Sequence, residues 1–123
     1  GIKRPVMHEY AGSSQLAQEE PITTGAVTLY SAAVAVEITR VVIANTGATG
    51  RQFRLFHDDD GAVYSTSTAL FYDVSVAPNT TIFLDADVLG GGIPVGPTGT
   101  IGARSPATAA LTFTLYGIPR GSR

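Results

Sequence analysis

The chain has 123 residues and a formal net charge of −2; 44% of its residues are hydrophobic and only 15% are charged. Its length is that of one domain, and its charge provides no strong field for nucleic acid or an anionic membrane. It has no cysteine, which excludes disulfides and thiolate metal sites. No apolar run approaches the about 20 residues that span a bilayer. A charged share below the usual quarter or so indicates a protein that buries part of its surface in an assembly.

Residues 1–22 differ from the rest of the chain because they carry several charges and show no alternation of period two. Within them, residues 13–20 are predicted to form one or two helical turns, capped by a serine and stopped before Pro21. A helix this short is not stable alone. We therefore expect an N-terminal arm that becomes ordered against another protein; the alternative is a frayed terminus.

The body of the domain begins near Thr23, and its first strand is predicted over residues 27–30. Residues 34–45 also alternate, but the parity of their apolar side chains changes around Thr39 and Arg40. A β-bulge accounts for this change, because one extra residue in a strand switches the face that the following side chains occupy.

Four later segments alternate in the same way and are separated by turn residues: 51–57, 69–76, 80–85 and 107–117. Their inward side chains are predicted to be Phe53, Leu55, Leu70, Tyr72, Val74, Val76, Ile82, Leu84, Leu111, Phe113 and Leu115. Residues 90–99 are rich in glycine and proline and are expected to form a surface loop. Residues 100–105 are expected to form a weak edge strand.

These short strands predict an all-β domain, because several of them lie within about a hundred residues. We expect an antiparallel β-sandwich, jelly-roll-like, with an extended N-terminal arm. The expected divisions are residues 1–22 for the arm, 23–118 for the sandwich and 119–123 for a C-terminal tail. No internal repeat and no second domain are expected.

Half of the ten aromatic residues lie opposite the inward set on their strands: Tyr30, Phe56, Phe71, Phe83 and Tyr116. Aromatic side chains gathered on outer faces indicate a covered patch. We therefore predict that these five residues form a subunit interface. The alternative is that both faces of some strands are buried within one chain, for example beside the N-terminal arm.

The segment from His57 through Asp58, Asp59 and Asp60 to Gly61 is the polar cluster best suited to site chemistry. An oxygen-rich turn can bind Ca²⁺, and Asp85 and Asp87 would add ligands if the fold brought them close. The turn lacks the spaced ligands and distal glutamate of an EF-hand. We interpret the three aspartates as solvated hairpin residues that are weak metal candidates, and we expect no cofactor.

Catalysis has little support in the sequence. No Gly-x-Ser-x-Gly segment is present, and neither glycine-rich segment, 47–51 or 90–99, matches a phosphate-binding motif. Arginines occur in several strands, but without net positive charge they do not indicate a nucleic-acid surface. We expect that the protein is not an enzyme.

Five segments together resemble the small β-sandwich structural proteins of tailed-bacteriophage virions: 41–47 (VVIANTG), 53–61 (FRLFHDDDG), 68–74 (TALFYDV), 78–81 (PNTT) and 113–117 (FTLYG). The likeness covers about residues 23–118 and consists of strand and turn patterning. It implies a virion part, either a capsid decoration or cement protein or a head-fibre, tail or adaptor component, and it supplies no catalytic residues.

The resemblance also implies partners and a location. The expected partners are other copies of the chain and phage capsid or tail proteins, with no nucleic acid and no membrane. The protein would be made in the host cytoplasm and located in the virion. The alternative function is a small carbohydrate-binding β-sandwich module for host-surface attachment. A further alternative is a small hydrolase or metalloprotein built on the acidic turn.

Overall fold

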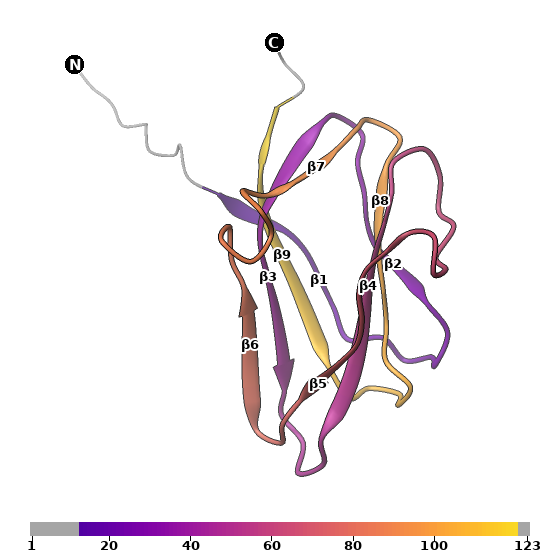
Figure 1. Ribbon diagram of the computed structural model, residues 1–123, viewed down its shortest axis with the longest axis vertical. Coiled ribbons are helices and arrows are strands. Elements are labelled where there is room, and N and C mark those ends of the chain that lie inside the picture. The colour runs from indigo at the N-terminus through magenta and orange to yellow at the C-terminus, as the bar shows by residue number, and fades with distance from the viewer. Residues whose placement is uncertain (1–12, 121–123) are drawn as a thin grey trace, which may run out of the picture.

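The computed structural model describes residues 13–120, which form two antiparallel sheets that face each other (Figure 1). The strands are β1 (Ser14–Glu19), β2 (Val27–Ser31), β3 (Val36–Asn45), β4 (Arg51–Asp58), β5 (Ala69–Val76), β6 (Thr80–Leu84), β7 (Ile93–Val95), β8 (Thr100–Arg104) and β9 (Thr112–Pro119). None of the described residues belongs to a helix that is long and apolar enough to cross a membrane.

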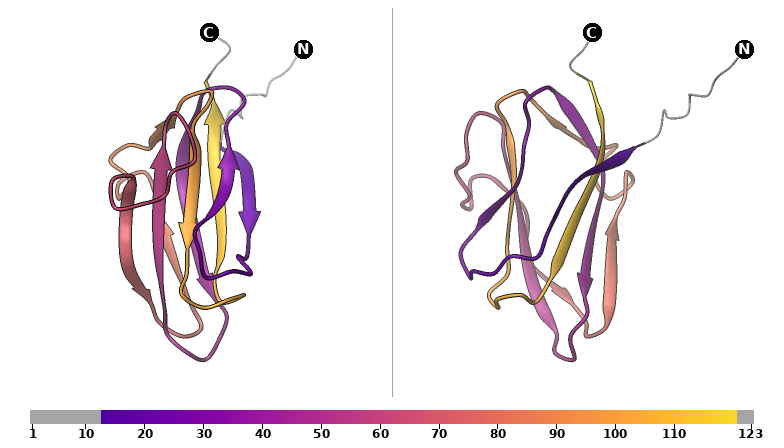
Figure 2. Two further views of the ribbon diagram at one scale, coloured as in Figure 1. Left: turned by 90° about the vertical axis from the view of Figure 1, so that its right-hand side faces the viewer. Right: turned by 180° about the vertical axis from the view of Figure 1, so that it is seen from behind.

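The strand order is that of a jelly roll. The first sheet has the order β1-β9-β3-β6, with β7 also paired to β3, and the second has the order β2-β8-β4-β5. With β7 set aside, each sheet has four strands and the chain crosses repeatedly between the sheets, as in double-sheet jelly rolls. Figure 2 shows the sandwich facing one of its sheets (left) and from behind (right). The predicted antiparallel, jelly-roll-like sandwich is confirmed.

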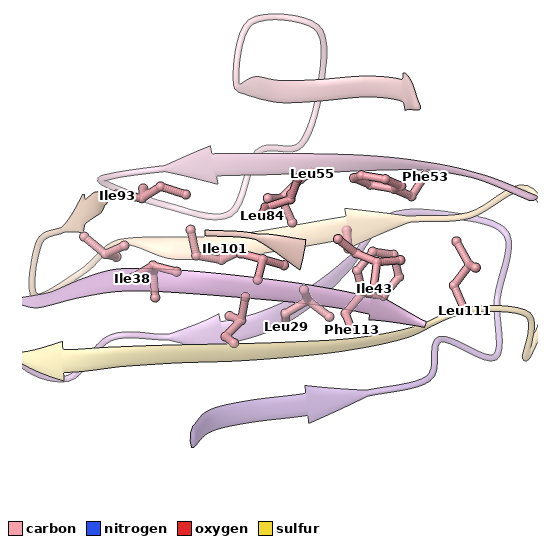
Figure 3. Packing of buried hydrophobic residues seen from close by; sticks show 14 of the residues in the cluster. Leu29, Ile38, Ile43, Phe53, Leu55, Leu84, Ile93, Ile101, Leu111 and Phe113 are labelled. Carbon is pink, nitrogen blue, oxygen red and sulfur yellow. The ribbon is translucent and has the colours of Figure 1, made fainter. Parts of the chain in front are cut away.

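Apolar side chains from both sheets fill the space between the layers (Figure 3). Phe53 and Phe113 meet edge to face, with ring centroids 6.1 Å apart, and both are fully buried. The predicted core residues Leu55, Leu84, Phe113 and Leu115 are buried. Val74, also predicted, is partly buried against them.

The predicted bulge in the long strand is confirmed. The pairing of β3 with β9 shifts register between Ile38 and Arg40. Val36 and Ile38 before the shift are buried, and so are Val41 and Ile43 after it. The shift separates the part of β3 that pairs with β7 from the part that pairs with β6.

The prediction of helical turns at residues 13–20 is wrong. Ser14–Glu19 is strand β1, which pairs antiparallel with β9. Its Leu16 and Ala17 pack against the core. A helix of this length leaves most of its end groups without partners, whereas β9 supplies partners for the backbone of β1. The described part of the predicted arm, residues 13–22, therefore includes a strand of the sandwich; residues 1–12 lie outside the described residues.

The expectation for residues 90–105 is also corrected. β8 is an inner strand between β2 and β4, and its Ile101 and Ala103 are fully buried. The predicted loop contains β7, where Pro94 is exposed between two buried residues. The prediction took glycine and proline as signs of a loop or a weak edge. In the structure Pro94 lies in the short edge strand β7, and Gly102 lies in the inner strand β8, where the Tyr64 ring covers it.

The parity predicted for β5 is wrong in its first half. Leu70 and Tyr72 are 43% and 46% exposed, whereas Phe71 packs against the core. The pairing of β4 with β5 has Phe53 opposite Val74 but Leu55 opposite Phe71, so β5 contains an extra residue between Phe71 and Val74, and a second register shift follows before Ala69. The extra residue reverses the faces of the side chains that precede it.

Candidate functional site

Asp58 ends β4 and is 8% exposed, so it is not the solvated turn residue that the sequence predicted. One carboxylate oxygen accepts a hydrogen bond from the backbone N–H of Val63 at 2.7 Å, and the other accepts one from Asp60 at 3.2 Å. These backbone donors, Val63 first, lower the pKa of Asp58 because they favour the charged carboxylate. The side chain therefore holds the start of the β4–β5 connection.

Asp59 links this turn to the segment before β8. Its Oδ1 accepts the backbone N–H of Gly96 at 2.7 Å and lies 3.2 Å from Nε2 of His57. The hydrogen bond from Gly96, and then that from His57, lower the pKa of the Asp59 carboxyl. A second bond fixes the same region, since Thr100 donates its hydroxyl to the carbonyl of Gly61 at 2.7 Å.

Asp60 matches the prediction of an exposed turn residue. Its pKa is raised, chiefly by a hydrogen bond and by charge repulsion with the Asp58 carboxyl. Within residues 13–120, no three His, Cys, Asp or Glu side chains are grouped so that they could hold a metal ion. Asp58 and Asp59 therefore act as backbone anchors: both oxygens of Asp58 accept backbone N–H groups, and Oδ1 of Asp59 accepts that of Gly96.

Phe56 points away from the core as predicted, but it is only 2% exposed. The β4–β5 connection folds back over the outer face of the second sheet, where Tyr64 lies against Phe56 with ring centroids 5.8 Å apart. The Tyr64 hydroxyl is 2.7 Å from that of Thr28. Phe56 is thus covered by its own chain and is not part of an exposed interface.

Three other residues of the predicted interface also contact their own chain. Phe71 lies on the core side of β5, with its ring centroid 6.4 Å from that of Phe53. Tyr30 is half-buried against the core because the pairing of β2 with β8 shifts between Thr28 and Tyr30. Tyr116 is half-buried on β9. Phe83 on β6 is the one member that is widely exposed, at 57%.

The prediction missed an exposed aromatic residue on β5. Tyr72 and Asp73 both lie opposite Arg54 at the bulge, where Asp73 has a φ of 54°. The Arg54 guanidinium stacks on the Tyr72 ring at 3.9 Å from its centroid and bonds the Asp73 carboxylate at 2.7 Å and 3.2 Å. This ion pair lowers the pKa of Asp73. No sequence signal marked this cluster of Arg54, Tyr72 and Asp73, because it depends on a bulge whose position is set by the pairing of β5 with β4.

The outer face of the first sheet carries a group of uncharged side chains around Phe83, which we call the outer stripe. Paired positions place its members in two rows across four strands: Gln18, Thr114, Val42 and Phe83, then Thr112, Ala44 and Thr81. Gln18 donates its side-chain N–H to the Thr114 hydroxyl at 2.9 Å, which helps to cover Thr114. The outer stripe ends at β6.

A shallow polar hollow of about 470 Å³ borders the outer stripe. It is lined by Ser13, Thr39, Arg40, Asp85, Ala86, Asp87 and Tyr116. Arg40 and Tyr116 are paired positions next to the bulge of β3, and Asp85 follows the end of β6. The hollow therefore places an aromatic ring, a guanidinium, two carboxylates and three hydroxyls together. Asp85 and Asp87 lie here and do not add ligands to the acidic turn.

Comparison with known proteins adds no relative, since no protein family, curated protein or solved structure matches this chain.

Proposed function

We propose that the protein is a structural component of a tailed-phage virion, a capsid decoration or cement protein or a head-tail or fibre component, and that it acts by protein–protein assembly. The proposal rests on the resemblance of residues 23–118 and on the surface around Phe83. Jelly rolls are common in viral capsid domains, but they also occur in lectins, so the fold alone does not decide the function.

One observation carries the assembly function. Residues 74–84 contain no charged residue, although they include the end of β5 and all of the edge strand β6. Phe83 stands exposed within this segment, as the member of the outer stripe on β6. Uncharged surface with an exposed aromatic at its edge is typical of an interface, because charged residues are depleted and aromatic residues are enriched at interface cores.

The proposal is tested by analysis of purified virions. Particles that have passed through two successive density gradients are digested, and the chain is quantified by mass spectrometry against a coat protein. We expect a fixed copy number per particle that survives high-salt washing, because apolar contacts are not screened by salt. Absence of the chain from the particles overturns the proposal.

A second candidate, a carbohydrate-binding module, is favoured by the polar hollow at Tyr116. Carboxylates and a guanidinium hydrogen-bond to paired hydroxyl groups, and an aromatic ring packs against the apolar face of a sugar. Under this function, binding to host-surface polysaccharide measured by calorimetry is lost in Arg40→Ala and in Asp87→Ala. It is retained in Asp60→Ala, a carboxylate of the other turn. Absence of binding by the unaltered chain removes this candidate.

A further inference from the structure

Most strand edges of the sandwich carry features that hinder pairing with another chain. β1, at one end of the first sheet, has a register shift and the charged Glu19. The ends of the second sheet are also irregular, since β2 has one register shift and β5 has two. The short β7 contains Pro94, which has no N–H to donate. Natural sheets use bulges, prolines and charges in this way to prevent edge-to-edge association.

β6 is the exception among these strands. Its five residues pair with β3 without any register shift. It contains no charge, glycine or proline, and no other strand of the described chain pairs with its outer edge. Its exposed Thr81 and Phe83 belong to the outer stripe. An edge that is regular, uncharged and partly apolar is a template for an added strand.

We propose that β6 pairs antiparallel with β6 of a second copy of this chain, about a two-fold axis at Ile82. The inference rests on the proposed assembly function and names its partner and contact. A two-fold interface uses the same patch on both subunits. β6 suits such an interface because it has no charge, glycine or proline that would oppose pairing with its own copy. The two first sheets then become one continuous sheet, and the two outer stripes join.

Residue pairing selects the position of this axis. Of the two-fold registers, the one centred on Ile82 pairs all five residues of β6. It places Phe83 opposite Thr81 of the second copy, and aromatic and β-branched residues form favourable cross-strand pairs. Beyond the strand ends, Asp85 lies opposite Asn79 of the second copy, so no like charges meet. The pairing therefore covers Phe83 without burying a charge.

The register is tested with cysteines, since the native chain has none. Thr81→Cys and Phe83→Cys proteins are incubated singly and mixed in a glutathione redox buffer. Directly opposite residues are within disulfide reach, whereas diagonal residues are not. We expect disulfide-linked dimers in the mixture, each containing one of each variant, and at most about one tenth as much dimer from either variant alone. No excess in the mixture overturns the proposed register.

The edge itself is tested with charge substitutions. Phe83→Lys places a like charge in each copy at the contact, and Val63→Lys is the matched control because Val63 is similarly exposed, at 61%, in the β4–β5 connection. Sedimentation velocity over about 5–500 µM should show concentration-dependent dimers for the unaltered chain and for Val63→Lys, with at least about a tenfold weaker association for Phe83→Lys. Unfolding curves establish that both variants are folded.

The results separate this inference from the proposed function. Monomers of the unaltered chain across the whole range, or equal association of the two lysine variants, overturn the β6 pairing even if the chain is present in virions. Conversely, absence of the chain from virions overturns the proposed function, while the cysteine and sedimentation results still decide the β6 pairing.

Discussion

The ring of Tyr64 lies directly against Gly102, so close that a Cβ atom at residue 102 would be 2.6 Å from a ring carbon. Gly102 is paired with Phe56 on one side and with Thr28 on the other. Tyr64 contacts both of these neighbours, through its ring and its hydroxyl. The absence of a side chain at Gly102 therefore allows the β4–β5 connection to cover the outer face of the second sheet.

Replacement of this glycine should destabilise the fold. In Gly102→Ala the added methyl group displaces the Tyr64 ring, and we expect a loss of about 1–3 kcal/mol, as for other overpacked sites. Urea denaturation measures the loss. Gly25→Ala is the control, because no atom lies within 4 Å of the Cβ position there. The double variant Tyr64→Ala/Gly102→Ala should lose less than the sum of the two single variants; strict additivity would contradict the contact.

The acidic turn should respond differently at its two ends. In Asp58→Asn one of the two backbone N–H groups faces the side-chain NH2 group, which cannot accept a hydrogen bond, so we expect a melting temperature lower by about 5 °C. Asp60→Asn removes the repulsion that raises the pKa of Asp60, so its melting temperature should be unchanged or slightly higher. Equal melting temperatures for the two variants would show that Asp58 does not anchor the connection. Differential scanning calorimetry at pH 7 provides the comparison.

Stability should fall in acid. Asp58, Asp59 and Asp73 have lowered pKa values, so their stabilisation is present above the unfolded pKa of about 3.9 and is lost as the pH falls through their folded pKa values. Asp60 has a raised pKa, so its ionised carboxylate lowers the stability and its protonation in acid raises it. Urea midpoints measured from pH 7 to pH 2.5 should therefore decrease below about pH 4. The decrease should be shallower in Asp58→Asn, and an unchanged slope would contradict the assignment.

Removal of β1 should weaken the sandwich. A chain that begins at residue 21 lacks β1, so β9 keeps only β3 as a partner, and the apolar surface that Leu16 and Ala17 cover is exposed. A chain that begins at residue 13 keeps both. We expect the shorter chain to unfold at a clearly lower urea concentration than the longer one, because β9 becomes an unpaired edge. Equal midpoints would show that β1 contributes little to the fold.

The sequence by itself determined the fold class and most of the core. Alternation identified Phe53, Leu55, Phe113 and Leu115 as inward residues, because a strand with one buried face must carry apolar side chains at every second position. The parity change near Arg40 located the bulge of β3 for the same reason. These features are local, so the order of residues in the chain was sufficient to predict them.

Tertiary structure alone decided which outward positions are exposed. Phe56 and Phe83 both face away from the core, yet Phe56 is covered by Tyr64 while Phe83 remains open. The difference depends on where the β4–β5 connection folds, and the alternation of side chains along a strand carries no information about that path. The same holds for β1, whose backbone is satisfied by β9 about a hundred residues away, and for Asp58, whose burial depends on the path of the connection after it. Contacts between segments far apart in the chain decided these features. They also decided that β6 lies at the edge of the first sheet.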